Sequence, residues 1–278
     1  MKKINRRSFL AAAGLTAAAL ALTGCGGSAS STASSTASSA ASSEAASTSA
    51  AAELTTVEAG KLTMATNATF PPYEMTTDSG EIEGIDVDTA KAIAEKLGLE
   101  LQIDDMDFDA ALLSVQQGKA DIVMAGVTVT DERKAVMDFS DSYATGIQSI
   151  IVPEGSDITS PDDLAGKKIG TQRGTTGYIY CSDDFGDDAV VAYDDGLTAV
   201  QALKNGQVDA VVIDNAPAKE YVAANPGLVI LDTSYAEEDY AIGMAKGSAL
   251  EDAVNAALEE LKADGTLQSI VDKYITAE

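Results

Sequence analysis

The chain has 278 residues, with 18 Lys plus Arg, 44 Asp plus Glu and no His, which gives a formal net charge of −26. Without His there can be no Ser-His-Asp triad, no Cys-His pair and no His-ligated zinc. A chain this acidic is a poor partner for nucleic acid, because phosphate contacts need a basic surface. The apolar fraction of 45% is sufficient for one or two domains with hydrophobic cores.

Residues 1–24 have the layout of a secretory signal. Basic residues precede an apolar stretch over residues 9–22, which is shorter than the roughly 20 residues needed to span a bilayer. The stretch runs into Leu-Thr-Gly-Cys, which resembles the lipobox of bacterial lipoproteins. This resemblance implies cleavage before Cys25 and its acylation, so that the protein is anchored at the outer face of the cytoplasmic membrane. The two arginines at 6–7 resemble a twin-arginine motif with altered flanks, which leaves the export route open.

Residues 25–59 form the predicted linker behind this anchor. Between residues 26 and 52 the sequence contains only Gly, Ser, Ala and Thr apart from Glu44. Such a stretch lacks the bulky apolar side chains that offset the entropy of ordering, and its composition favours a flexible coil. Cys181 is the only other cysteine of the chain, so lipidation of Cys25 excludes an intrachain disulfide.

From residue 60 onward, short apolar runs alternate with helical periodicity, as is typical of a parallel α/β sheet. The predicted order is strand, helix, strand, helix, strand at residues 61–66, 87–97, 99–103, 108–117 and 121–125. The alternation recurs at residues 168–171, 174–181, 190–193, 198–205 and 208–213, and amphipathic helices follow at 249–261 and 267–275. The sequence therefore predicts two α/β lobes, with a ligand site between them at the carboxyl ends of the strands.

A short internal echo links the two halves. Each half has a helix that ends at a glycine, followed by two residues, an aspartate and an apolar strand. The residues are Gly118 and Asp121 in the first half, and Gly206 and Asp209 in the second. The glycine is expected to cap the helix in a left-handed conformation. This repeated pattern supports two related lobes. The alternative is that the pattern is one that α/β proteins share in general.

Five segments together resemble the extracytoplasmic amino-acid-binding proteins of ABC transporters. The most specific is Ala-Gly-Val-Thr-Val-Thr-Asp-Glu-Arg-Lys-Ala-Val-Met-Asp-Phe-Ser at residues 125–140. In the family's order, it is joined by Phe-Pro-Pro-Tyr-Glu, Gly-Ile-Asp-Val-Asp, Gly-Thr-Gln-Arg-Gly-Thr-Thr and Val-Asp-Ala-Val-Val-Ile-Asp, which begin at residues 70, 84, 170 and 208. The resemblance covers roughly residues 60–276.

The resemblance implies an α/β fold of the two-lobe type II periplasmic-binding-protein class with two hinge crossovers. Lobe one would comprise residues 60–142 plus 241–278, and lobe two residues 148–235. Residues 143–147 and 236–240 would form the hinge about which the lobes close. Such a protein captures a free amino acid and delivers it to an ABC permease. It is expected to be a monomer without metal, cofactor or catalysis.

Arg133 is the residue that the family uses for the α-carboxylate of the ligand. It stands just inside a predicted helix start, where a guanidinium can grip a carboxylate with two parallel hydrogen bonds. The alternative is a surface arginine paired with Asp131 or Glu132, and Thr130 is the expected N-cap of the helix. The resemblance adds three ligand contacts from the preceding segment, which are Gly126, Val127 and Thr128.

On the second lobe, the resemblance assigns Asp214 to the ammonium group of the ligand. Asp214 ends an apolar strand, and the alternative is a helix cap ahead of Asn215. Thr175 and Thr176 stand at the first turn of a predicted helix, where free N–H groups and the helix dipole favour a carboxylate. Because Arg133 and Thr176 belong to different lobes, the ligand would hold the closed state together.

Four more residues are expected to surround the ligand's side chain. By resemblance, Phe70 and Phe108 form aromatic walls, whereas composition alone would place either in the core. Asn67 and Gln172 would also face the site. Family members that prefer cationic amino acids often carry an acid at the Asn67 position. The neutral amide therefore favours a polar, uncharged ligand.

Acidic clusters at residues 104–107, 183–188 and 237–239 suggest calcium sites at first sight. None has the Asp-x-Asp-x-Asp-Gly spacing of a calcium loop, and adjacent residues on a strand or helix point apart. We interpret these clusters as solvated surface charge.

Two other functions stay open at this point: a dehydratase of the same fold acting on arogenate or prephenate, and a sensor lobe for a membrane receptor.

Overall fold

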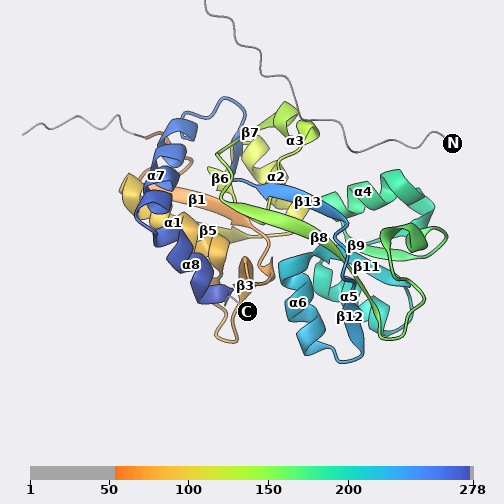
Figure 1. The fold of residues 1–278 in the computed structure, drawn as a ribbon. Coiled ribbons are helices and arrows are strands. Elements are labelled where there is room, and N and C mark those ends of the chain that lie inside the picture. The colour runs from red at the N-terminus through yellow and green to blue at the C-terminus, as the bar shows by residue number, and fades with distance from the viewer. Residues whose placement is uncertain (1–53, 276–278) are drawn as a thin grey trace, which may run out of the picture. The chain divides into compact units, whose positions relative to one another are not determined.

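The computed structural model describes residues 54–275 (Figure 1). The predicted signal, Cys25 and most of the linker lie outside the described residues and stay predictions. The described residues form two mixed sheets, each covered by helices on both faces, and one small three-stranded sheet. We refer to the two larger sheets with their helices as lobe one and lobe two.

The sheet of lobe one has the strand order β5-β1-β6-β14-β7. Its strands are β1 (Lys61–Thr66), β5 (Glu100–Asp105), β6 (Ile122–Val123), β7 (Met137–Phe139) and β14 (Gly243–Ala245). β1 pairs in parallel with β5 and β6, as predicted, whereas β14 adds antiparallel pairs with β6 and β7. Side chains alternate along β1, so Met64 packs on one face of the sheet and Ala65 on the other.

Helices cover both faces of this sheet. One face is covered by α1 (Ile85–Leu97), α7 (Glu251–Ala263) and α8 (Thr266–Tyr274), and the other by α2 (Phe108–Gln116). A short helix, α3 (Asp131–Val136), precedes β7. α1 ends at Gly98, whose φ of 71° is left-handed, as the glycine in the sequence predicts.

The small sheet brings an aromatic and an acidic side chain together. It consists of β2 (Thr69–Phe70), β3 (Glu74–Thr76) and β4 (Ile82–Glu83). Phe70 lies directly opposite Glu74 in the antiparallel pair. Directly opposed residues place their side chains on the same face of a sheet, so both face the space between the lobes.

The sheet of lobe two has the order β10-β9-β11-β8-β12, and β13 also pairs with β8. Its strands are β8 (Ala144–Pro153), β9 (Ile169–Gln172), β10 (Val190–Tyr193), β11 (Ala210–Asp214), β12 (Leu228–Ile230) and β13 (Ala236–Tyr240). β9, β10 and β11 are parallel, as predicted. The helices are α4 (Thr176–Phe185), α5 (Gly196–Lys204) and α6 (Asn215–Ala224), with 3₁₀ turns η1 (Pro161–Leu164) and η2 (Asp187–Ala189).

Two antiparallel strands carry the chain between the lobes. β8 enters lobe two after β7, and β13 returns the chain to β14 (Figure 1). The two strands pair from Ala236 opposite Gln148 to Tyr240 opposite Ala144, which is where the predicted hinge segments lie. A Cβ at Gly146 would stand 2.5 Å from the ring carbon Cζ of Tyr240, so glycine is required at this close approach.

Two helices of lobe two begin where a polar side chain caps them. α4 begins at Thr176, after Gly174 with its left-handed φ of 73° and after Thr175, whose hydroxyl accepts a hydrogen bond from the Tyr178 N–H. α5 begins two residues earlier than the periodicity predicts. The reason is Asp195, whose Oδ1 accepts the Thr198 N–H at 2.7 Å.

The internal echo marks the same structural role in both lobes. The Oδ2 of Asp121 accepts the Thr63 N–H of β1 at 2.7 Å, and the Oδ2 of Asp209 accepts the Lys168 N–H beside β9 at 2.7 Å. The preceding glycines have left-handed φ values, 66° at Gly118 and 69° at Gly206. Each aspartate therefore ties the strand that it begins to the neighbouring strand.

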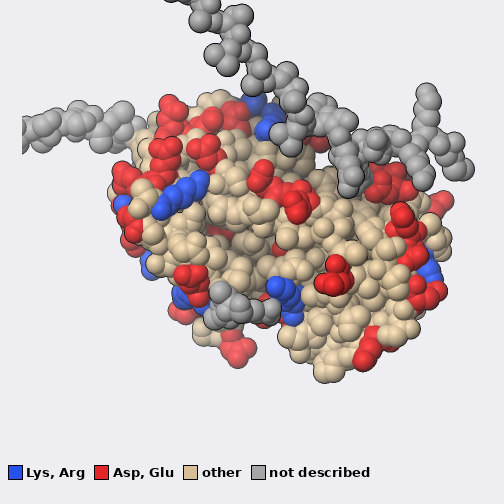
Figure 2. Space-filling model, in the orientation of Figure 1, with Lys and Arg blue, Asp and Glu red and all other residues tan. Residues whose placement is uncertain are grey.

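Acidic side chains are spread over the visible face of the molecule, and basic side chains lie among them at separate points (Figure 2). Among residues 54–275, no three Cys, Asp or Glu side chains are grouped in a way that could hold a metal ion. Glu238 departs from the predicted surface charge, because it is buried while Glu237 and Asp239 are exposed. The alternation along β13 turns its side chain inward. No helix within the described part of the chain is long and apolar enough to cross a bilayer.

Candidate functional site

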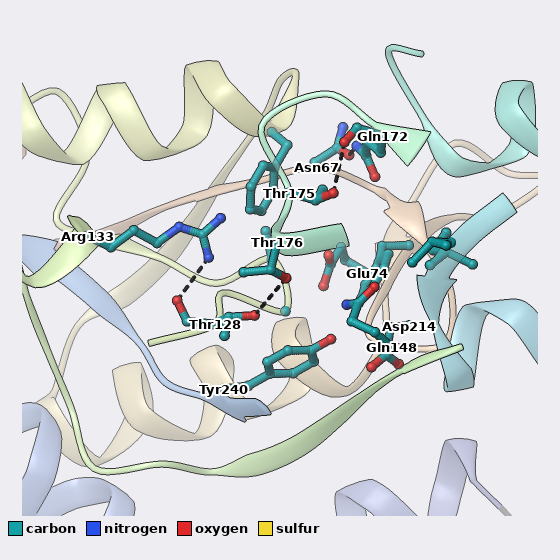
Figure 3. Close-up of a pocket in the computed structure, with 16 residues that line it drawn as sticks. Asn67, Glu74, Thr128, Arg133, Gln148, Gln172, Thr175, Thr176, Asp214 and Tyr240 are labelled. Atoms are coloured by element: carbon teal, nitrogen blue, oxygen red, sulfur yellow. Dashed lines mark hydrogen bonds between the residues drawn. The ribbon is translucent and has the colours of Figure 1, made fainter. Parts of the chain in front are cut away.

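A pocket lies between the lobes, at the carboxyl ends of β1, β9 and β11 (Figure 3). It brings together ten predicted site residues: Asn67, Phe70, Phe108, Gly126, Thr128, Arg133, Gln172, Thr175, Thr176 and Asp214. Six further residues line it: Glu74, Ala125, Gln148, Val212, Ile213 and Tyr240. Val127 is not part of this lining. Its side chain is fully buried in the core beside α2, and its carbonyl accepts the Ala241 N–H.

Arg133 enters the pocket from lobe one. Thr130 caps α3 as predicted and accepts the Arg133 N–H at 3.2 Å, which fixes the start of the side chain. The guanidinium donates to the Thr128 carbonyl at 2.9 Å and to the Gly174 carbonyl of lobe two at 3.2 Å, and it lies 5.3 Å from the centre of the Phe108 ring. Two of its five N–H groups are thus used, and the others remain for a ligand.

The surroundings of this guanidinium contain no acidic partner at ion-pair distance among residues 54–275. The alternative of a surface arginine paired with Asp131 or Glu132 does not apply, because Arg133 is 8% exposed. Burial lowers the pKa of Arg133, and the nearby charge of Glu238 acts in the opposite direction. A buried cation without a contacting anion is the arrangement that a carboxylate ligand would complete.

Thr175 and Thr176 bring the N-terminus of α4 to the same place from lobe two. The Thr175 hydroxyl donates to the Gln172 carbonyl at 2.8 Å and caps the helix. The hydroxyl of Thr176 lies 3.4 Å from that of Thr128 on the opposite lobe. The first-turn N–H groups and the positive end of the helix dipole favour an anion beside these hydroxyls. An arginine, two hydroxyls and a helix N-terminus therefore converge on one side of the pocket (Figure 3).

Asp214 lies on the opposite side of the pocket from Arg133 (Figure 3). It caps α6 by accepting the Ala216 N–H at 3.0 Å, and its other oxygen accepts the Ile147 N–H of β8 at 2.7 Å. It is therefore a helix cap and a pocket residue at once. Burial raises the pKa of this carboxyl to about 6, and hydrogen bonds from Ala216, Tyr240 and Ile147 act to lower it. A cationic group beside Asp214 would stabilise its ionised form.

Asn67 and Gln172 join the two lobes directly. The Nε2 of Gln172 donates to Oδ1 of Asn67 at 2.8 Å, and Nδ2 of Asn67 donates to the Met106 carbonyl at 3.0 Å. The Thr69 hydroxyl also donates to Asn67 Oδ1, at 3.0 Å. The amide oxygen of Asn67 is thus fully engaged within the protein. A further link between the lobes comes from the Tyr221 hydroxyl of α6, which donates to the Thr69 carbonyl at 2.6 Å.

Two buried carboxylates in this region were not predicted from the sequence. Glu74 is fully buried in the pocket lining, and neither of its oxygens accepts a hydrogen bond from the described residues. Glu238 accepts from the Thr128 hydroxyl at 3.1 Å and from Gln148 Nε2 at 2.9 Å, which ties lobe one to the crossover strand β8. The signal for Glu74 was the Pro-Pro turn between it and Phe70, which places the two residues opposite each other in a hairpin. The strand alternation of β13 was the signal for the second.

Comparison with known proteins decides the family. The sequence model of the bacterial extracellular solute-binding proteins, family 3, matches residues 62–277. The chain belongs to this family. This solute-binding protein is 34% identical to the arginine-binding extracellular protein ArtP of Bacillus subtilis (strain 168), over 78% of its own chain and 87% of that protein. It is 36% identical to the ABC transporter glutamine-binding protein GlnH of the same organism, over 71% of its chain and 74% of that protein.

Solved structures agree with this assignment. The arginine-, lysine-, histidine-binding protein ArtJ of Geobacillus stearothermophilus is 35% identical, covers 78% of this chain and 96% of its own, and superposes with a TM-score of 0.75. The solute-binding protein therefore has the two-lobe α/β fold that the sequence motifs imply. Its relatives are amino-acid-binding proteins, so the prediction of a binding protein and not an enzyme is confirmed.

Proposed function

We propose that this solute-binding protein captures one free amino acid between its lobes and delivers it to an ABC permease. The observation that carries the proposal is the polarity of the pocket: a buried arginine with the N-terminus of α4 lies on one side, and the buried Asp214 lies on the other. This arrangement is complementary to the carboxylate and the ammonium of a zwitterion.

The α-carboxylate would bind Arg133 together with the hydroxyls of Thr128 and Thr176 and the first N–H groups of α4. The ammonium would bind Asp214. Arg133 extends from lobe one and Thr176 from lobe two, so a bound carboxylate would draw the lobes together. Bending of the paired strands β8 and β13 would accompany this closure, as expected for a hinge-type binding protein.

The charges of the lining favour a ligand side chain that carries N–H groups. The lining contains one basic residue, Arg133, and two acidic residues, Asp214 and Glu74. A zwitterion neutralises Arg133 and Asp214 and leaves the buried Glu74 without a partner. A guanidinium or ammonium side chain between Phe70 and Phe108 would supply that partner, which makes a cationic amino acid the first candidate.

An amide side chain is the second candidate, and the neutral Asn67 favours it. Because Asn67 binds Gln172, Thr69 and Met106, it contributes no negative charge to the pocket. An amide group also carries N–H donors for Glu74, and this keeps a polar, uncharged amino acid such as glutamine in the proposal.

Thermal unfolding of the purified protein with each of the twenty amino acids tests this proposal. Arginine and lysine are expected to give the largest rise in Tm and glutamine a smaller rise. Glutamate and aspartate are expected to give none, because the described lining has no second basic residue for a side-chain carboxylate. A ligand at 100 times its Kd adds about 2.7 kcal/mol to the free energy of unfolding. A folded protein that responds to no amino acid would contradict the function. A larger rise with glutamine than with arginine and lysine would select the amide ligand.

The proposal includes a lipid anchor at Cys25, behind which the linker of residues 25–59 would let the lobes reach a permease. Cys25→Ser is expected to remove lipid incorporation and to move the protein from the membrane fraction to the soluble fraction, since an acylated thiol is the proposed attachment. Labelling with a radioactive fatty acid, followed by fractionation, measures both effects. The matched control is Cys181→Ser, at a buried thiol in α4. An unchanged membrane fraction for Cys25→Ser would refute the anchor.

A further inference from the structure

Glu74 and Asp86 form a pair of buried carboxyls beneath the pocket. Both are fully buried, Glu74 on β3 and Asp86 on α1. Asp86 is well provided with donors, because its Oδ1 accepts the Tyr143 hydroxyl at 2.7 Å and its Oδ2 accepts the Gly126 N–H at 3.0 Å. Glu74 receives no such hydrogen bond from the described residues. The donors therefore favour a negative charge on Asp86 over one on Glu74.

The electrostatic surroundings of Glu74 contain acids and tyrosines. The titratable groups that act on it, or on which it acts, are Asp86 on α1, Asp105 at the end of β5, Tyr73 beside it, Tyr143 ahead of β8 and Tyr221 on α6. None of these groups in the described part of the chain is a cation. Burial, followed by the charge of Asp86, raises the pKa of Glu74 well above its usual range, and burial raises that of Asp86 to about 6.

The backbone brings the two carboxyls to neighbouring positions, because the Asp86 N–H donates to the carbonyl of Tyr73, the residue before Glu74, at 2.9 Å, and Gly126, which donates to Asp86, lines the same pocket as Glu74. Two ionised carboxylates can only repel at this range, whereas one shared proton turns the contact into a hydrogen bond. Glu74 lines the pocket, so its other carboxyl oxygen stays available to a ligand when the first one shares the proton. The empty site therefore holds a neutral acid at the place where the ligand's side chain would lie.

We propose that the Glu74–Asp86 pair retains one proton in the empty protein and releases it to solvent when a ligand with a cationic side chain binds, so that pH sets the preference between cationic and amide ligands. This proposal rests on the proposed amino-acid-binding function. The O–H bond of Glu74 breaks, its proton passes to water, and the guanidinium or ammonium of the ligand pairs with the carboxylate that is left.

The direction of the pH dependence of affinity follows from the exchange of the Glu74 proton for the cationic side chain of the ligand. At low pH, binding of a cationic side chain competes with the proton, so affinity rises about tenfold per pH unit until the pair of the empty protein is deprotonated. An amide ligand can donate an N–H to the oxygen of Glu74 that does not share the proton, so it binds without displacing that proton. Asp214 meets the same ammonium group in both ligands, so its contribution cancels when the two ligands are compared.

Calorimetric titration with arginine and with glutamine, in two buffers that differ in ionisation enthalpy, counts the protons released. Between about pH 5 and about pH 8, arginine is expected to release up to one proton more than glutamine, with the ratio of the two Kd values changing about tenfold per pH unit. Glu74→Gln should abolish both the excess proton and the change in ratio. Glu81→Gln, an exposed position in the loop before β4, is the matched control and should keep both. Equal proton release for the two ligands in the unmodified protein overturns the proposal.

Infrared spectroscopy of the empty protein separates this proposal from the function on which it rests. The unmodified protein should have a protonated-carboxyl band near neutral pH that Glu74→Gln lacks and Glu81→Gln retains. Absence of that band overturns the retained proton, whichever amino acid binds. If the band is present and no amino acid binds, the proposed function fails, and the proton release fails with it.

Discussion

Arg133→Ala is expected to weaken amino-acid binding by roughly 30-fold to 4000-fold, which corresponds to a loss of about 2–5 kcal/mol. The guanidinium is 8% exposed, and its position is fixed by the carbonyls of Thr128 and Gly174 and by the ring of Phe108. Among residues 54–275 it is the only basic group in the pocket lining, so its removal would leave the ligand carboxylate buried with hydroxyls and N–H groups alone. Isothermal titration calorimetry measures the change.

The controls for this variant separate charge, geometry and folding. Arg133→Lys keeps the charge but loses the planar fork, so an intermediate loss of affinity is expected. Arg173→Ala removes an exposed arginine at the edge of the cleft, where the contact to Asp194 is 3.7 Å long, and should leave affinity unchanged. Thermal unfolding should confirm that both Arg133 variants fold. Removal of the guanidinium leaves no buried carboxylate without its ion-pair partner, because Arg133 has no ion pair among the described residues. Normal binding by Arg133→Ala would show that the carboxylate site lies elsewhere.

Asp214→Asn is expected to weaken binding by about 2 kcal/mol or more while the fold is retained, because a hydrogen-bonded charge partner of the ammonium is lost. Asn caps helices about as well as Asp, so the hydrogen bond from Ala216 survives. Asp214→Ala should lose the cap as well, with a further fall of about 1 kcal/mol in the free energy of unfolding. Calorimetry and denaturant unfolding distinguish the two losses.

The pH dependence of the stability of the empty protein provides a second test of the role of Asp214. Burial raises the pKa of Asp214 to about 6 from its ordinary value of 3.8, so the folded state holds the proton over a range where the unfolded state has lost it. Stability of the empty protein should therefore fall as the pH rises from about 4 through about 6, and Asp214→Asn should remove that part of the fall. Asp195→Asn, at the cap of α5, is the control and should change neither binding nor this dependence. Unaltered affinity in Asp214→Asn would argue against the ammonium contact.

Helices and strands could be predicted where apolar residues repeat on one face. The prediction failed where contacts with other parts of the fold decide where an element begins or ends. β1 and β10 match their predicted residues, and the periodic helices α1 and α2 match closely. The strand predicted at 121–125 is reduced to two residues, Ile122 and Val123, by its short pairing with β1. Helix α6 was anticipated only through the alternative role of Asp214 as a helix cap, because its sequence of small and polar residues has little apolar contrast and contains Pro217 near its start.

Residues of the pocket could be predicted where they stand in a contiguous sequence motif. Residues that strand pairing alone brings into the interior could not be predicted in this way. Arg133, Thr176 and Asp214 stand in contiguous motifs, and the structure brings them to one pocket. Glu238 stands in a run of three acids that resembles ordinary surface charge. It becomes an interior residue only because β13 pairs with β8 and places it opposite Gly146. Val127 lies within a motif but points into the core, since neighbouring residues of an extended segment face opposite ways.

The hydrogen bonds from Gln172 to Asn67 and from Tyr221 to the Thr69 carbonyl join the lobes without any ligand atom. Part of the free energy of closure therefore belongs to the protein alone, and the apparent Kd is the intrinsic Kd divided by the fraction of empty molecules already closed. Evolution could tune the affinity of this receptor through residues that never touch the amino acid. A transporter that recognised only the closed shape would also bind empty receptors. The strength of the hydrogen bonds between the lobes therefore limits how tightly transport is coupled to the presence of a ligand.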